Sequence, residues 1–242
     1  MKRLLAIKNI DRENPGLFKV IAEELGMEVI IINLSLGESL PRLTTNDILL
    51  ILGGPMGISD LSNPKYLWLN SEIDIIKSAI ELDIPFIGVC LGAQLLAYAL
   101  GGNTIPLIDS VSNTPLPEIG WSNLSLVNNE YINIFNKIDI NELFVLHWHG
   151  DKILLPKSSK LLASSERCLE QMFSDGTKLI GLQFHVEVLE SDYIKWINED
   201  SEFIRKGLGI DADKILFDQI KYLRSSIISR KAFIRNLLIS LG

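Results

Sequence analysis

Short apolar runs alternate with longer amphipathic segments over the first hundred residues. The runs are rich in β-branched and aliphatic side chains and lie at residues 4–7, 29–32, 48–52 and 84–89. Between them, segments 15–25 and 66–82 carry apolar residues three and four positions apart, the spacing of an amphipathic helix. Buried strands separated by helices predict an α/β fold with an open, mostly parallel sheet covered by helices on both faces.

The pattern changes after about residue 103, where proline and asparagine become more frequent. Further strands are predicted at residues 120–127, 143–147, 160–164 and 179–184, as an extension of the sheet. From residue 191 onward the pattern is helical. The residues predicted to form its apolar face are Ile220, Leu223, Ile227, Ile234, Leu237 and Leu238. The basic residues predicted around that face are Lys221, Arg224, Arg230 and Arg235.

These patterns predict one domain over residues 1–190 and a C-terminal helical extension over residues 191–242. We expect the extension to pack on the domain, the alternative being a helix that binds a membrane surface or a partner. The chain is 47% hydrophobic and 22% charged, a balance that can bury a real core and argues against disorder.

Net charge and hydropathy limit the binding partners and the cellular compartment that we expect for this protein. With 23 basic and 30 acidic side chains the formal charge is −7, which disfavours nucleic acid as a partner because phosphate binding relies on a broad basic surface. No apolar run approaches the roughly 18 residues of a membrane-spanning helix, and the start MKRLLAIKN turns polar too soon for a secretory signal. We expect a cytoplasmic protein without membrane contact.

The segment IPFIGVCLGAQLLAYALGG, residues 84–102, joins an apolar strand to an apolar helix through Cys90. Gly88 and Gly92 stand two positions before and after it, which allows the sharp turn that presents a nucleophile at the top of a sheet. A helix N-terminus also favours a thiolate, the reactive form of cysteine. Cys90 is therefore a candidate nucleophile, whereas Cys168 has no such turn and is predicted to be a buried, inert thiol.

A cysteine nucleophile needs a base, and the chain has three histidines. His185 follows the predicted strand 179–184, and Glu187 lies two positions on, so both side chains of an extended backbone project to the same side. The carboxylate can hold the imidazole, which completes a Cys, His, Glu triad.

His147 and His149 allow a different interpretation, because two histidines two positions apart on a strand can present their nitrogens to one zinc ion. No convincing third ligand lies near them in the sequence, and we predict no metal. Trp148 and Gly150 indicate the wall of a shaped pocket instead. The turn GGPMG after strand 48–52 can aim backbone N–H groups at a ligand, but by itself it is equally typical of an ordinary turn.

Taken together, GGPMG, GVCLGAQ, HWHGDK and GLQFHVE, in that order, resemble the triad-type (class I) glutamine amidotransferases with a flavodoxin-like fold, most closely stand-alone proteins similar to the amidotransferase domain of GMP synthase. The resemblance spans about residues 1–190 and includes EIGW at residues 118–121. It implies that Cys90 is the nucleophile, His185 the general base and acid, and Glu187 its orienting partner. Val186 departs from the proline usual between the histidine and the glutamate.

The resemblance also implies the remaining site residues and the reaction. The implied oxyanion hole is the backbone N–H groups of Gly54 and Leu91, and the implied glutamine-binding positions are Gln94, Gly150 and Asp151. The implied reaction converts glutamine to glutamate and ammonia through a thioester and requires no cofactor. Ammonia would pass to an acceptor outside this chain, for example a separate synthase subunit.

Two other functions stay open at this point. The same triad could hydrolyse a γ-glutamyl peptide or amide, since no acceptor domain is evident. The chain could also be a non-catalytic binding or regulatory module that keeps the fold without turnover.

Overall fold

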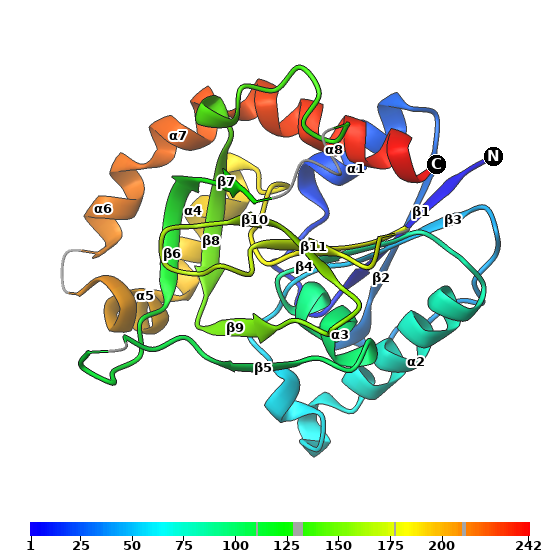
Figure 1. Ribbon diagram of the computed structural model, residues 1–242, viewed down its shortest axis with the longest axis horizontal. Coiled ribbons are helices and arrows are strands. Elements are labelled where there is room, and N and C mark those ends of the chain that lie inside the picture. The colour runs from blue at the N-terminus through cyan, green and yellow to red at the C-terminus, as the bar shows by residue number, and fades with distance from the viewer. Residues whose placement is uncertain (110, 128–132, 177, 210–211) are drawn as a thin grey trace.

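The computed structural model describes residues 1–109, 111–127, 133–176, 178–209 and 212–242. Within these ranges a central sheet has eight strands in the order β2-β1-β3-β4-β12-β11-β10-β7 (Figure 1). The strands are β1 (Arg3–Lys8), β2 (Glu28–Asn33), β3 (Asp47–Ile51), β4 (Phe86–Val89), β7 (Ser125–Leu126), β10 (Lys160–Ser164), β11 (Met172–Ser174) and β12 (Leu179–Leu182).

The five strands from β2 to β12 run parallel, whereas β12, β11, β10 and β7 pair antiparallel. The parallel half is apolar on both faces: Leu4 and Ala6 of β1 enter one hydrophobic cluster, and Leu5 and Ile7 enter the other. Burial on both faces explains why these strands read as continuous apolar runs. The predicted open, mostly parallel sheet is confirmed.

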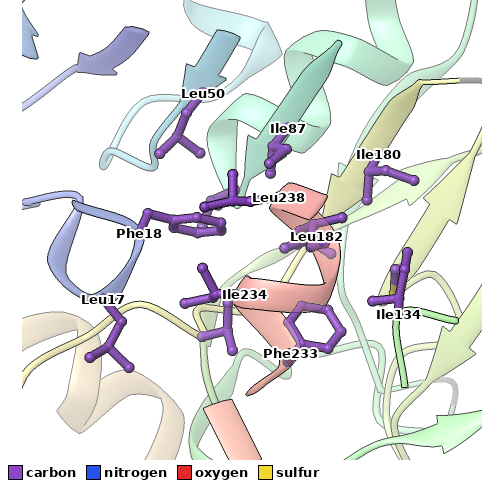
Figure 2. Packing of buried hydrophobic residues seen from close by; sticks show 14 of the residues in the cluster. Leu17, Phe18, Leu50, Ile87, Ile134, Ile180, Leu182, Phe233, Ile234 and Leu238 are labelled. Atoms are coloured by element: carbon purple, nitrogen blue, oxygen red, sulfur yellow. The ribbon is translucent and has the colours of Figure 1, made fainter. Parts of the chain in front are cut away.

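Helices cover the two faces of the sheet. On one face lie α1 (Gly16–Glu24) and α8 (Ile227–Leu241), and on the other lie α2 (Trp68–Glu81) and α3 (Leu91–Ala99). Figure 2 shows Phe233, Ile234 and Leu238 of α8 packed against the first face, beside Phe18 of α1. The helical extension thus supplies part of the core that supports the sheet.

A second layer of elements stands beside the sheet. It consists of the antiparallel pairs β6 (Glu118–Asn123) with β8 (Phe144–His149) and β5 (Asn103–Pro106) with β9 (Asp151–Leu154). The helices α4 (Glu190–Glu199), α5 (Ser201–Leu208), α6 (Ala212–Asp218) and α7 (Ile220–Ser225) follow in the chain. Short 3-10 helices occupy Leu34–Leu36, Ile58–Asp60, Pro64–Tyr66 and Ile140–Glu142.

Two details of the sequence-based prediction were wrong. The single strand predicted at residues 120–127 is two strands, because β6 pairs with β8 whereas β7 joins the central sheet. Arg230 was expected among the basic residues around the apolar face of the helical extension, but it is fully buried. Its guanidinium lies 4.9 Å from the Trp121 ring and donates hydrogen bonds to the backbone carbonyls of Val186, Val188 and Leu223. Hydrogen bonds to carbonyls are what make a buried guanidinium tolerable.

No helix among the described residues is long and apolar enough to cross a membrane.

Candidate active site

Cys90 lies at the carboxyl end of β4, directly before α3, with φ 50° and ψ −107°. This strained conformation is characteristic of a nucleophile turn. The flanking glycines are required by close backbone contacts: a Cβ on Gly88 would lie 2.4 Å from the carbonyl carbon of Gly92, and a Cβ on Gly92 would lie 2.1 Å from the carbonyl oxygen of Ile51. The sharp turn predicted from the glycine spacing is therefore present.

The neighbouring strand β12 brings His185 to Cys90. The Cys90 N–H donates to the carbonyl of Leu182 at 2.7 Å, which fixes the turn against the end of β12. A Cβ on Gly53, at the end of β3, would lie 3.2 Å from Cys90 Cβ and 3.0 Å from His185 Cε1, so the two side chains flank one point. Three adjacent parallel strands thus converge on the site with their carboxyl ends.

Glu187 holds the His185 ring from its far side. His185 Nδ1 lies 2.7 Å from Glu187 Oε1, and Trp196 packs edge-on against the ring at 4.8 Å between centroids. Burial opposes a charge on His185, but the Glu187 carboxylate and the Cys90 side chain outweigh burial and hold the pKa of His185 well above 6.5. This favours the imidazolium form of His185.

Val186, where the family usually has proline, contributes a hydrogen bond that proline lacks. Its backbone N–H donates to Glu187 Oε2 at 2.9 Å, while Oε1 of the same carboxylate faces His185. Both oxygens of Glu187 are thereby fixed. The departure from proline leaves the histidine–glutamate geometry intact.

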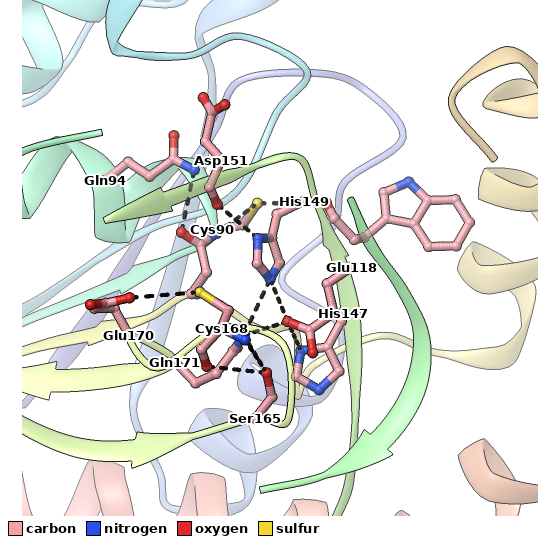
Figure 3. Close-up of polar contacts among 12 residues, drawn as sticks. Cys90, Gln94, Glu118, His147, His149, Asp151, Ser165, Cys168, Glu170 and Gln171 are labelled. Atoms are coloured by element: carbon pink, nitrogen blue, oxygen red, sulfur yellow. Dashed lines mark hydrogen bonds and ion pairs between the residues drawn. The ribbon is translucent and has the colours of Figure 1, made fainter. Parts of the chain in front are cut away.

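Cys90 and His185 open into a pocket of about 880 Å³. Gly54, Leu91, Gln94, Gly150 and Asp151 all line it, so the structure brings together every residue that the resemblance implied. Gln94 is buried on α3, and its Nε2 lies 3.3 Å from Gln183 Oε1; the Gln183 amide in turn lies 3.7 Å from Cys90 Sγ. Figure 3 shows Gln94, Cys90 and Asp151 around this space.

The helical extension closes one side of the pocket, which sequence reasoning missed. Residues 199–203 and Lys206 line the pocket at the junction of α4 and α5. Asp200 accepts two hydrogen bonds from Arg12, each at 2.6 Å, and a third from Trp148 Nε1 at 2.8 Å. These hydrogen bonds join the extension to the segment between β1 and α1 through Arg12, and to β8 through Trp148.

Glu13 is a second residue that sequence reasoning missed. Its carboxylate is 6% exposed and lies against Gly53, where a Cβ would be 2.4 Å from Oε2. Burial raises the pKa of Glu13 to about 7, although His185 and Arg12 lower it. No periodicity or motif marks this loop residue, so the sequence carries no signal for it.

The other cysteine lies outside the pocket lining. Cys168 is buried, and burial raises the pKa of its thiol to about 12. A thiol of that pKa is unreactive at neutral pH.

His147 and His149 meet a third buried side chain that the sequence did not indicate. Glu118 lies opposite His149 in the β6–β8 pair, and its Oε2 is 3.1 Å from His149 Nε2 and 3.5 Å from His147 Nδ1. The lack of a third ligand near the two histidines was the reason for predicting no metal, and that reason does not hold.

Comparisons with known proteins place the chain in a family. Residues 18–200 match the family model described as glutamine amidotransferase class-I. The chain is 29% identical over 184 residues to the glutamine-hydrolyzing GMP synthase of Streptococcus mutans, which covers 74% of this chain and 34% of that protein. It is 29% identical over 177 residues to the glutamine amidotransferase-like protein YfeJ of Salmonella typhimurium, covering 72% of this chain and 71% of that protein.

Solved structures agree with this placement. A glutamine amidotransferase from Thermotoga maritima superposes with a TM-score of 0.83 at 30% identity, covering 99% of this chain and 97% of that one. The chain spans about a third of the Streptococcus mutans GMP synthase but nearly all of the Thermotoga maritima protein. The match over residues 18–200 shows that the chain belongs to the class-I glutamine amidotransferase family.

Proposed function

We propose that the protein hydrolyses the side-chain amide of glutamine through a thioester on Cys90. The observation that carries the proposal is the strained Cys90, which lines one pocket with His185, while Glu187 lies 2.7 Å behind the His185 ring. An imidazolium next to a thiolate is the activated form of a cysteine nucleophile.

In the first half of the reaction, the Cys90 thiolate attacks the amide carbon of glutamine. The developing oxyanion accepts hydrogen bonds from the backbone N–H groups of Gly54 and Leu91, a contribution typically worth about 10²–10³ in rate per donor. His185 then donates its proton to the departing nitrogen, which leaves as ammonia. The C–N bond is replaced by a C–S bond.

In the second half, His185 accepts a proton from water, and the hydroxide attacks the thioester. The C–S bond breaks, the thiolate of Cys90 returns with the imidazolium, and glutamate leaves. Glu187 stays ionised and orients the ring throughout. Gln94, Gly150 and Asp151 hold the glutamine.

We further propose that the ammonia passes to an acceptor enzyme outside residues 1–242. Support comes from the relatives named glutamine-hydrolyzing GMP synthase, of which this chain matches the amidotransferase part. A separate synthase subunit of that kind would use ammonia that this chain releases.

A second candidate function is favoured by the size of the pocket. Its volume of about 880 Å³ falls near the top of the roughly 300–1,000 Å³ range that holds drug-sized ligands, well beyond the needs of one amino acid. A γ-glutamyl peptide or amide with a larger leaving group would fit, and the same triad would cleave it.

Glutamate release from glutamine tests the proposal, with Cys90→Ala compared against Cys168→Ala. We expect Cys90→Ala to abolish release and Cys168→Ala to keep it, and activity that survives in Cys90→Ala would overturn the thioester mechanism. Parallel assays with γ-glutamyl amines and dipeptides decide between the two substrates. Wild-type protein that turns over none of them, and is not labelled at Cys90 by a glutamine-like electrophile, would favour a non-catalytic module.

A further inference from the structure

Behind the pocket wall lies a cluster of buried polar side chains that the proposed reaction does not use. Glu118 begins β6, and His147 and His149 lie on β8. Gln171 reaches the cluster from the segment before β11 (Figure 3). These side chains are at most 6% exposed. One ligand atom from each of Glu118, His147 and His149 lies within 4.8 Å of the others.

The hydrogen bonds of His149 leave its Nε2, an acceptor in the neutral ring, facing a carboxylate oxygen of Glu118. His149 Nδ1 lies 2.8 Å from the backbone carbonyl of Asp151, which can only accept, so Nδ1 carries a hydrogen. In a neutral ring, Nε2 then presents a lone pair. That nitrogen lies 3.1 Å from a carboxylate oxygen of Glu118, which is also an acceptor, and the Gln171 amide nitrogen lies 2.7 Å from that oxygen and 3.3 Å from the His149 nitrogen.

Other atoms of the cluster have no hydrogen-bond partner among the described residues. Both ring nitrogens of His147 and the amide oxygen of Gln171 are buried and have no hydrogen-bond partner among the described residues. A half-satisfied polar network in a core is costly. A cation bound by one nitrogen of His147 and one nitrogen of His149 would accept the lone pair of each of these nitrogens.

The spacing of the ligand atoms fits a tetrahedral ion. Zn²⁺ binds nitrogen and oxygen at about 2.0–2.1 Å, which places neighbouring ligands of a tetrahedron about 3.3 Å apart. Glu118 Oε2 lies 3.1 Å from His149 Nε2 and 3.5 Å from His147 Nδ1, on either side of that value. The Gln171 amide group is 3.3 Å from His149 Nε2, and a half turn would point its unpaired oxygen toward the same centre.

We propose that Glu118, His147 and His149 bind one divalent transition-metal ion of the Zn²⁺ class. Two imidazoles and a carboxylate are a donor set that such ions prefer. The hydrogen bond from His149 Nδ1 to the Asp151 carbonyl is the outer contact that commonly orients a ligating histidine.

The ion would have a structural role at the pocket. It would join β6 to β8 at the point where β8 leads into Gly150 and Asp151, which line the pocket. Cys90 and His185, which follow β4 and β12, are not among its proposed ligands, and the ion takes no part in bond breaking. It fixes the wall against which the substrate packs.

The test is the metal content of the full-length protein, purified without a histidine tag and after growth with added zinc. Elemental analysis by mass spectrometry should find about one zinc per wild-type chain. His147→Gln and Glu118→Gln should each lower that content at least about tenfold. Cys90→Ser and His185→Gln serve as matched controls. They remove the thiol and the imidazole of the reactive pair, which are not proposed ligands, and should retain the metal.

Two further measurements cover variants that fail to fold. Wild-type protein stripped with a chelator should bind Co²⁺ with the visible absorption of a four-coordinate ion. Added Zn²⁺, at about 100 times its dissociation constant, should raise the melting temperature of that stripped protein by about 5–10 °C.

The proposal is overturned if wild-type protein lacks metal after purification and stripped protein binds neither Zn²⁺ nor Co²⁺. It is equally overturned if the metal is lost from Cys90→Ser or His185→Gln and kept in His147→Gln, since the ion would then occupy the reactive pair.

Discussion

Replacing Glu187 with glutamine tests how much the negative charge of Glu187 contributes to the triad. Glu187 accepts from His185 Nδ1 with one oxygen and from the Val186 N–H with the other. A glutamine has one acceptor and one donor at its end. If its oxygen faces His185, its NH₂ group meets the Val186 N–H; if it turns, its NH₂ group forces the wrong tautomer on His185. The first orientation loses the hydrogen bond to Val186, and the second keeps both contacts but moves the proton of neutral His185 to Nε2.

The size of the effect follows from the distance. Two unit charges 2.7 Å apart interact by about 6 kcal/mol at an effective dielectric constant of 20. A neutral hydrogen bond recovers part of this in one orientation, so we expect kcat for glutamine hydrolysis to fall about 10²–10⁴-fold with little change in KM.

The pH profile gives an independent readout. The pKa of His185 is raised in the folded protein, so the imidazolium persists until pH rises through that value, and activity should be lost on the alkaline side. Without the Glu187 charge the pKa falls, and the alkaline limb of kcat in Glu187→Gln should move to lower pH. Glu190→Gln, which removes a surface carboxylate paired with Arg224, should change neither kcat nor the limb. An alkaline limb that stays in place in Glu187→Gln would refute the electrostatic role.

Three further predictions concern other parts of the fold. Gly92→Ala places a Cβ 2.1 Å from the Ile51 carbonyl oxygen, and should lower the free energy of unfolding by about 3 kcal/mol or more, measured in urea, and abolish glutamine hydrolysis. Glu72→Gln should stabilise the protein increasingly as pH rises from about 4.5 to about 8. Burial raises the pKa of Glu72 to about 8 from 4.5, so ionisation of Glu72 costs the wild type stability across that window, by about 5 kcal/mol in total. Asp200→Asn weakens the bidentate pair with Arg12 and should raise KM for glutamine about tenfold at unchanged kcat.

Each of these three variants has a matched control. Gly26→Ala has a positive φ of 74° and open space around it, so it should cost only about 1 kcal/mol and leave activity intact. Glu81→Gln lies exposed on the same helix as Glu72 and should give no pH-dependent gain. Asp83→Asn removes a surface ion pair with Lys178 and should not move KM. A variant that behaves like its control contradicts the corresponding prediction.

The parts of the fold that the sequence predicted best are those set by local pattern. The strands predicted at residues 4–7 and 29–32 lie within β1 and β2, and the strand predicted at residues 48–52 extends one residue past the end of β3. The turn at Cys90 was equally readable, because backbone contacts admit only glycine at residues 88 and 92. Short strands such as β5 and β9 were missed, since their pairing depends on partners about fifty residues away.

The parts of the site that sequence reasoning missed depend on tertiary contacts. Glu13 and Asp200 follow no periodicity, and each reaches the pocket from a connection between elements. Glu118 was noted only as part of EIGW, and its proximity to the two histidines arises from the register of β6 with β8. Arg230 was expected at the rim of the apolar face. Its burial depends on backbone carbonyls that lie more than forty residues earlier, with one exception on α7.

The position of Arg230 has a consequence for the order in which a ribosome makes this chain. The Val186 and Val188 carbonyls that it binds flank Glu187, so the backbone of the residue proposed to orient His185 is held in place by a residue synthesised after it. A nascent chain that has already exposed Cys90, His185 and Glu187 still lacks this support. We therefore expect it to release no ammonia until α8 has emerged and docked.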